Sequence, residues 1–335
     1  MTAAARRLVR LLRDPASAAE VRDWDAVLAA ARAESLAGSL ACRLDGQPLP
    51  APVARLMEDA RRAAETARTE ALWEAEMARR ALAPLGVPVV LLKGTAYAAA
   101  GPDAARGRSI GDLDILVPRA ALADVERALL AAGWEWVKED AYDDLYYRRW
   151  MHELPPLIHR ARDRMIDVHH TILPLTAGPK PDADALIASS LPLADGLRIL
   201  APADMVVHAA AHLIADGDLA GGLRNLWDIG RLLRQFAADD PGFWDALQAR
   251  AVHHGLWRAV HRAARLANDL YATPIPETWR TRDSAAPLFR ARLLARDGWG
   301  RPTRPALRLG FYTRSHLLRM PPLMLARHLL IKARR

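Results

Sequence analysis

The chain has 335 residues, enough for about two compact domains, and 51% hydrophobic against 26% charged residues, which excludes a mostly disordered protein. Cys42 is the only cysteine, which excludes an internal disulfide and a Cys-based zinc site and favours a cytoplasmic location. No apolar run approaches the ~18 residues needed to span a bilayer. The formal charge of +8 is concentrated in residues 298–335, which hold nine Lys or Arg and no Asp or Glu, so a basic surface over the whole protein is excluded and nucleic acid is not an expected partner.

The first 83 residues are predicted to form an N-terminal helical region (1–83). Apolar residues recur at three- and four-residue intervals from Thr2 to Leu82, with breakers only around Gly46 to Pro52. Residues 53–82 are predicted to be one long helix, and its mixed Glu and Arg side chains are typical of a solvated face. Alanine and arginine are abundant throughout the chain, a bias typical of a GC-rich bacterial gene.

The pattern changes at Pro84 and predicts strands mixed with helices over 84–180. The run PLGVPVVLLKG (84–94) is typical of a buried strand that ends in a turn. We expect a helix over 95–100, a polar loop over 101–111, the strand DLDILVP (112–118), and a helix over 119–132 that ends at Gly133. Further strands are predicted within 134–140, 142–154 and 157–173, with the last segment folding back as a hairpin about RARDR.

From residue 181 onward the chain is predicted to be helical again. We expect a C-terminal helical domain over 181–297, followed by a basic tail over 298–335. The helices of the domain are predicted near 182–190, 202–215, 220–237, 241–253 and 255–270.

Two acidic patterns point to a metal site. Alternate side chains of a strand share a face, so Asp112 and Asp114 project together from DLDILVP, and Asp167 and His169 project together from MIDVH. If the two strands are neighbours, Asp167 completes a cluster of three carboxylates. Neighbouring anions are costly unless a cation compensates them, and Mg²⁺ prefers oxygen ligands, so this cluster is a candidate two-metal site for phosphate chemistry. The alternative is that D-x-D at an exposed strand edge is only surface polarity.

The turn before the D-x-D strand favours the functional interpretation. Lys93, Gly94 and Thr95 lie between a strand and a helix start, where free backbone N–H groups can bind phosphate. Lys93 adds a cation, and Arg106 and Arg108 lie in the loop that enters the D-x-D strand.

Together these motifs resemble the nucleotidyltransferase fold of the DNA polymerase β superfamily. LLKGTAYAAAGPDAARGRSIGDLDILV followed by MIDVHHTILP is similar, more narrowly, to the family of uncharacterised nucleotidyltransferases, over about residues 88–235. The resemblance implies an α+β fold with a mixed sheet, a nucleotidyltransferase core over 84–180 and helical regions on either side. It also implies catalytic, metal-binding roles for Asp112, Asp114 and Asp167, and nucleotide-binding roles for Lys93, Gly94, Thr95, Arg106 and Arg108. Thr95 stands where the superfamily usually has Ser, and the sixteen residues between Thr95 and Asp112 predict a bulged loop.

Polar residues downstream are candidates for supporting roles. His208 and His212, four residues apart, share a helix face and could bind zinc, but no Glu follows His208 as a zincin requires. We favour a buried polar tie of His212 to Asp228 or Arg224, which would dock the helical half onto the catalytic half. His169 is a further candidate for a supporting role, in which it contacts the metal ligands and not the metal itself.

The sequence therefore predicts a nucleotidyltransferase that uses Mg²⁺ or Mn²⁺ to move an NMP group from an NTP, with ATP as the first choice, to an unidentified hydroxyl- or phosphate-bearing acceptor. Small molecules, sugars and peptides are all open as acceptors. The alternative is a catalytically degenerate nucleotide-binding scaffold, recruited through residues 303–335 to a membrane or an acidic partner. Residues 321–335 are amphipathic if helical, and either contact an anionic membrane or pack onto the domain, which we favour.

Overall fold

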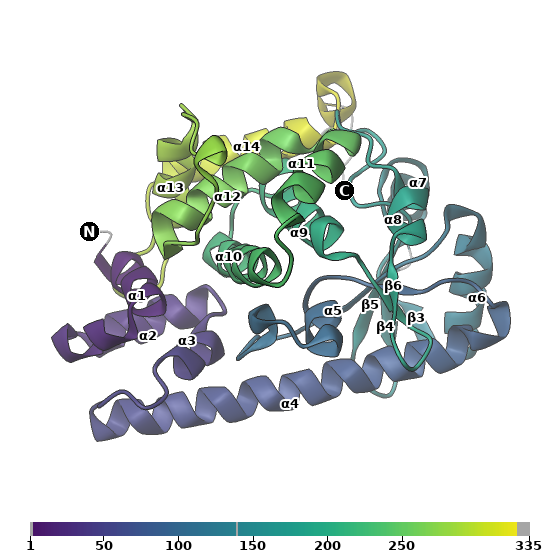
Figure 1. Cartoon of the computed structure of the whole chain (residues 1–335). Helices are drawn as coiled ribbons and strands as arrows, with labels where there is room; N and C mark the ends of the chain where they lie inside the picture. The colour runs from purple at the N-terminus through teal and green to yellow at the C-terminus, as the bar shows by residue number, and fades with distance from the viewer. Residues whose placement is uncertain (1–2, 139, 327–335) are drawn as a thin grey trace.

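The computed structural model of the chain describes residues 3–138 and 140–326 and confirms an α+β fold. One hydrophobic cluster extends from the N-terminal helices through the sheet to the C-terminal helices. Figure 1 shows the long helix α4 (Ala51–Leu82) running below the molecule from the N-terminal helices to the sheet, with the C-terminal helices gathered above it.

Seven strands within the described residues form one mixed sheet in the order β3-β4-β5-β2-β1-β7-β6. Their bounds are β1 (Val90–Leu91), β2 (Leu113–Leu116), β3 (Trp134–Trp136), β4 (Leu157–His159), β5 (Met165–His169), β6 (Leu191–Pro192) and β7 (Arg198–Ile199). At the centre, β2 pairs antiparallel with β1 and parallel with β5. The predicted hairpin is formed by β4 and β5, which join antiparallel on either side of residues 160–164. The D-x-D strand and the later Asp-x-His strand are therefore neighbours.

The N-terminal region consists of α1 (Ala3–Arg13), α2 (Trp24–Ala33), α3 (Ala37–Arg43) and α4, so the predicted long helix over 53–82 is confirmed. It begins slightly earlier than predicted because Pro52 fits the first turn of a helix. Gly38 of α3 contacts the loop before β2 so closely that a Cβ on Gly38 would lie 2.4 Å from the carbonyl oxygen of Gly107. This backbone contact positions the bulged loop over 101–111.

The remaining helices of the core and the C-terminal part follow the predicted order. In the core they are α5 (Lys93–Ala100) and α6 (Leu122–Ala131). After β5 they are α8 (Ala183–Ala188), α9 (Pro202–Ala210), α10 (Gly222–Asp239), α11 (Phe243–His253) and α12 (Trp257–Tyr271), and a further helix that was not predicted, α13 (Ala286–Leu293), follows them. A π-helical turn over Ala211–Asp216 continues α9, within the segment predicted as a single helix.

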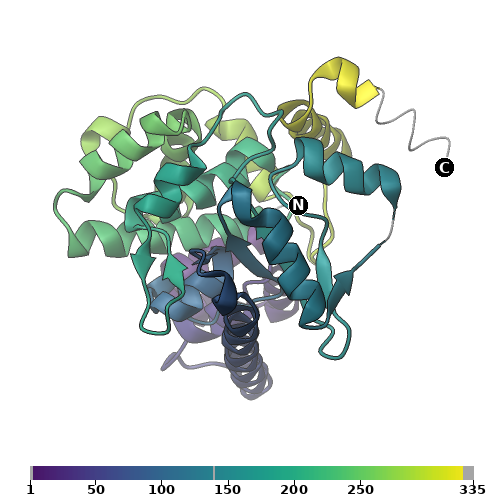
Figure 2. The same cartoon turned by 90° about the vertical axis from the view of Figure 1, so that its right-hand side faces the viewer.

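Helix α14 (Pro305–Arg319) packs the first part of the basic tail onto the domain. Phe311 meets Phe289 of α13 edge-on at 5.0 Å, and Arg319 forms an ion pair with Asp216 of the π-helical turn. Figure 2 shows the yellow C-terminal segment beside the teal part of the core, where Met320 is buried against Tyr146. Of the predicted amphipathic helix over 321–335, residues 327–335 lie outside the described residues.

Two predictions of secondary structure are wrong. The segment 142–154 is mainly a helix, α7 (Ala141–Trp150), and not a strand. The Asp140 carboxylate caps this helix by accepting from the amides of Tyr142 and Asp143, and this cap with the Asp144–Arg148 ion pair outweighs the strand preference of the tyrosines.

The second error concerns the region expected to be entirely helical. Strands β6 and β7 form a hairpin there and extend the sheet beside β1. The pairing is short, and Pro192 at the sheet edge weakened its signal in the sequence. The division of the chain into regions 1–83, 84–180, 181–297 and 298–335 stays a prediction. Within the described residues, no helix combines the length and the apolar character that crossing a membrane requires.

Candidate active site

The acidic residues of β2 and β5 meet because these strands lie side by side and run parallel. The pairing register places Asp114 opposite Asp167 and Leu116 opposite His169. Side-chain alternation then puts Asp114, Asp167 and His169 on one face, and their potential ligand atoms lie within 4.8 Å of one another. Asp112 precedes β2, is exposed, and lines the same cleft as Asp114. Two distant segments of the chain thus supply one acidic cluster.

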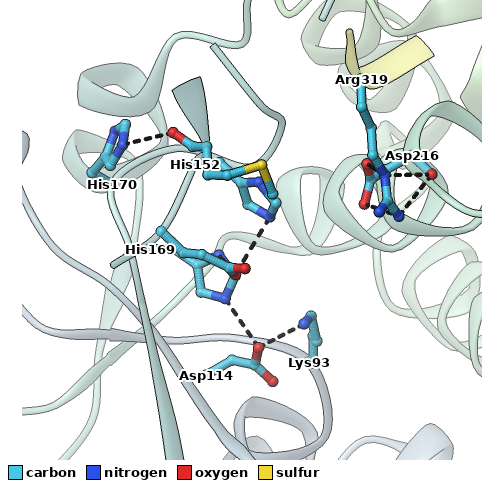
Figure 3. Close-up of polar contacts among 9 residues, drawn as sticks. Lys93, Asp114, His152, His169, His170, Asp216 and Arg319 are labelled. Carbon is cyan, nitrogen blue, oxygen red and sulfur yellow. Dashed lines mark hydrogen bonds and ion pairs between the residues drawn. The ribbon is translucent and has the colours of Figure 1, made fainter. Parts of the chain in front are cut away.

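Asp114 lies at the centre of this cluster and is 5% exposed. Its Oδ1 is 2.6 Å from Lys93 Nζ and 3.0 Å from His169 Nε2, as Figure 3 shows. Burial favours the neutral acid, but Lys93 and His169 hold the pKa of Asp114 well below its usual range. Both contacts use Oδ1, and Oδ2 receives no hydrogen bond from any described residue.

His169 connects Asp114 to a second acidic residue, Glu153. The Nδ1 atom of His169 lies 3.4 Å from Glu153 Oε2, and the backbones of these residues form an isolated antiparallel bridge. The ring of His152 lies 5.2 Å from that of His169. Burial raises the pKa of Glu153, and burial and His169 lower the pKa of His152 well below its usual value, so His152 is neutral.

The other two aspartates lack the compensation that Asp114 has. Burial, reinforced by Asp114 and Glu153, raises the pKa of Asp167 to about 7. Partial desolvation and the charge of Asp114 also raise the pKa of Asp112, although this side chain is exposed. The site therefore carries more negative charge than Lys93 balances. This excess, together with the unused Oδ2 of Asp114, fits a bound divalent cation with oxygen ligands.

The turn from β1 into α5 lies beside the acidic cluster. Lys93 adopts a left-handed φ of 47°, which is uncommon for a residue with a side chain, and its ammonium contacts Asp114. Burial opposes the charge of Lys93, but Asp114 outweighs this effect and raises the pKa of Lys93. A Cβ on Gly94 would lie 1.8 Å from Arg108 Nη1, so only glycine leaves room for the guanidinium over this turn.

Arg108 also ties the loop before β2 to the helical half. Arg108 Nε donates to Asp228 Oδ2 at 2.9 Å, and Arg224 Nε donates to Asp228 Oδ1 at 3.2 Å. Arg224 reaches further, with Nη1 donating to the carbonyl oxygen of Ser35 at 2.8 Å. The polar tie between the two halves is therefore present, but Arg108 takes the place predicted for His212.

A cleft of about 500 Å³ opens beside these groups, and we call it the β2 cleft. Its walls include Lys93, Gly94, Arg108, Asp112, Asp114, His212, Arg224 and Asn225. Two of the predicted nucleotide-binding residues do not line it. Thr95 is 1% exposed and its hydroxyl has no hydrogen-bond partner among the described residues, while Arg106 is exposed elsewhere on the loop. His208 is buried in α9, and His212 opens onto the cleft.

The sequence interpretation missed three residues of the site. Glu153 was hidden in a segment predicted as a strand. Asn225 lines the cleft from α10. Glu34 comes from the N-terminal region, where its Oε2 accepts from the Leu223 amide at 3.0 Å and its Oε1 from Arg296 at 2.7 Å. No local motif marks such a long-range contact.

Comparison with known families agrees with this geometry. The model of a family described as uncharacterised nucleotidyltransferase matches residues 20–272, about three quarters of the chain. The protein therefore belongs to this family of nucleotidyltransferases, and the resemblance carried by the Leu-Lys-Gly, Asp-x-Asp and Asp-x-His motifs is confirmed. None of the curated proteins compared with the chain matches it.

Proposed function

We propose that the protein is an active nucleotidyltransferase that moves an NMP group from an NTP to an acceptor, with ATP as the first nucleotide to test and Mg²⁺ or Mn²⁺ as the metal. The observation that carries the proposal is the acidic cluster of Asp114 and Asp167 beside the turn at Gly94. Family membership supports the reaction class, and the chemistry depends on these particular side chains.

The cation would be held by Asp112, Asp114 and Asp167. A divalent cation at these carboxylates supplies charge neutralisation for phosphate oxygens and lowers the pKa of an acceptor hydroxyl. The excess negative charge of the cluster and the open Oδ2 of Asp114 support this assignment. Magnesium and manganese fit better than zinc because the three proposed ligands are carboxylates.

The residues at the turn have a separate task in this proposal. The first amides of α5, near Gly94, together with Arg108 and Arg224 bind the triphosphate in the β2 cleft. Lys93 balances the buried charge of Asp114 and adds to the positive potential at the phosphates. Their role is to orient the α-phosphorus and to stabilise its developing charge.

Transfer itself requires a proton acceptor. The acceptor oxygen forms a bond to the α-phosphorus, the bond from that phosphorus to the pyrophosphate oxygen breaks, and the acceptor proton passes to Asp167. Asp167 is the carboxylate proposed for this task because it lies beside Asp114 on the same face of the sheet.

The test measures nucleotide binding and transfer separately. Calorimetry with a non-hydrolysable ATP analogue, with and without Mg²⁺, should show metal-dependent binding that Asp112→Ala weakens at least ten-fold. Incubation with α-labelled NTPs and candidate acceptors should then label an acceptor. Absence of metal-dependent nucleotide binding contradicts the proposal, and binding without transfer to any acceptor favours the degenerate scaffold.

A further inference from the structure

A second cavity adjoins the β2 cleft on the side of the C-terminal helix, and we call it the α14 pocket. It measures about 400 Å³, within the usual range for a small-molecule site. Its walls come from the π-helical turn with Asp216, from α10, and from Tyr312, Ser315 and Arg319 of α14. His212 and Asn225 line both the α14 pocket and the β2 cleft, so the two cavities meet at these side chains.

The two cavities draw on different parts of the chain. The cations and aspartates of the β2 cleft, from Lys93 to Arg224, all fall within the residues matched by the family model. The α14 wall of the second pocket lies beyond residue 272, where the match ends. Figure 3 shows the Asp216–Arg319 pair apart from the Lys93–Asp114 pair, on the side of the C-terminal helices. The α14 pocket thus combines residues of the matched segment, from His212 to Asn225, with a wall of α14 residues from outside it.

The charged groups of the α14 pocket are already paired. Arg319 Nε donates to Asp216 Oδ1 at 2.7 Å, and Arg319 Nη2 to Oδ2 at 3.3 Å. Asp218 accepts from the Ala220 amide at 2.8 Å and faces Arg292 at 3.9 Å. Among the described residues that line the pocket, each charged side chain therefore already has a counterion. An ionic ligand would have no unpaired charge to bind there. Recognition there has to rely on neutral groups.

Neutral groups suited to binding hydroxyls are available. The ring of His212 is exposed to the two cavities, yet the protein packed around it and the nearby Lys93 lower its pKa, which favours the neutral imidazole. The side chains of His212 and Asn225 make no hydrogen bond to any other described residue, which leaves an imidazole and an amide free at the junction of the cavities. Tyr312 is 52% exposed, its ring meets that of His316 edge-on at 4.5 Å, and it offers an apolar face.

We propose that the α14 pocket binds the acceptor, and that this acceptor is an uncharged ring compound with several hydroxyls, of the monosaccharide class. The inference rests on the proposed function, because it assigns the second substrate of the same reaction. The ring lies against Tyr312, while His212 and Asn225 hold a hydroxyl toward the β2 cleft. That hydroxyl oxygen bonds to the α-phosphorus, pyrophosphate leaves, and Asp167 takes the proton.

The test uses the full chain and a panel of three probe classes: neutral methyl hexopyranosides, cationic glucosamine and anionic glucose 6-phosphate. Binding is measured by saturation-transfer difference NMR in the presence of Mg²⁺ and a non-hydrolysable ATP analogue. We expect a neutral glycoside to bind at least ten-fold more tightly than either charged sugar. Tyr312→Ala and Asn225→Ala should each weaken glycoside binding about ten-fold, and Leu309→Ala, on an exposed part of the same helix outside the pocket, should not.

Nucleotide affinity, measured by calorimetry on the same samples, separates the two proposals. Tyr312→Ala should leave this affinity within two-fold of the unaltered chain. Binding of no neutral glycoside, tighter binding of a charged sugar, or a loss of nucleotide affinity in Tyr312→Ala overturns the acceptor pocket. If instead the unaltered chain binds a neutral glycoside but no nucleotide, the proposed function is overturned and the sugar site stands.

Discussion

The two adjoining cavities are built by opposite strategies. The β2 cleft gathers charged side chains from separate segments, and its buried aspartate at position 114 depends on Lys93 and His169 for compensation. In the α14 pocket the charged side chains form ion pairs with one another, and neutral imidazole, amide and aromatic groups line the cavity. Phosphate chemistry needs strong local charge, whereas selection of a neutral acceptor needs hydrogen bonds and shape. The contrast predicts that substitutions on the two sides affect different kinetic quantities.

The largest difference should appear when the central carboxylate is changed. Asp114→Asn keeps the shape of the side chain but removes the negative charge between Lys93 and His169. We expect the rate of NMP transfer at saturating substrates to fall by on the order of 10³-fold, since an electrostatic group of the reaction centre is lost. The measurement is initial-rate kinetics with α-labelled NTP and the labelled acceptor.

Tyr312→Ala is the matched change in the other cavity. It should raise KM for the acceptor and leave kcat within a few-fold of the unaltered enzyme. Equal losses of kcat in the two variants would contradict the separation of the cavities. Circular dichroism of both proteins checks that neither result reflects unfolding.

The second prediction concerns stability. Asp228→Asn leaves the buried guanidinium groups of Arg108 and Arg224 without their shared carboxylate. Removing one partner of such a buried network costs about 3–5 kcal/mol of the free energy of unfolding, which urea denaturation measures. Asp124→Asn, in the exposed pair with Arg127, is the control and should change little. A small effect at Asp228 would mean that the tie does not hold the two halves together.

Local patterns were sufficient to predict the elements that carry the acidic residues. The alternation in DLDILVP and MIDVH predicted β2 and β5, and the glycine turn predicted the start of α5 beside them. These predictions succeeded because each depends on neighbours in sequence: the period of a strand, a turn residue, a helix start.

Contacts between distant segments could not be predicted in this way. Glu34 caps α10 from the other end of the chain, and Arg108, rather than His212, reaches Asp228. The helix at 141–150 was mistaken for a strand because its tyrosines favour β structure, while its stability comes from the Asp140 cap and the Asp144–Arg148 pair. Such features arise from tertiary packing, which a single sequence does not encode in local patterns.

The third prediction tests the fit of Arg108 over the turn. In Gly94→Ala the new Cβ would collide with Arg108 Nη1, and the guanidinium has to move away from the first amides of α5. We expect the affinity for the ATP analogue to fall about ten-fold, because one charge-assisted contact to the triphosphate is displaced. Calorimetry measures the change.

Gly178→Ala, where a Cβ meets nothing within 4 Å, is the control for the added methyl group. Glycoside binding in the α14 pocket should stay unchanged in both glycine variants. Unaltered nucleotide affinity in Gly94→Ala would show that Arg108 does not contribute to phosphate binding from this position.

The smallest expected effect is a thermal shift on adding metal alone. A cation that binds only the folded chain stabilises it by about 1.4 kcal/mol at ten times its Kd, which raises Tm by about 2–4 °C. The shift should vanish in Asp114→Asn and persist in Tyr312→Ala, since the cation is proposed to bind Asp114 and its neighbours Asp112 and Asp167, whose raised pKa values show incomplete compensation. Differential scanning calorimetry with Mg²⁺, and after its removal with EDTA, measures it. An equal shift in Asp114→Asn would place the bound cation somewhere other than the β2 and β5 aspartates and would remove the electrostatic basis for distinguishing the two cavities.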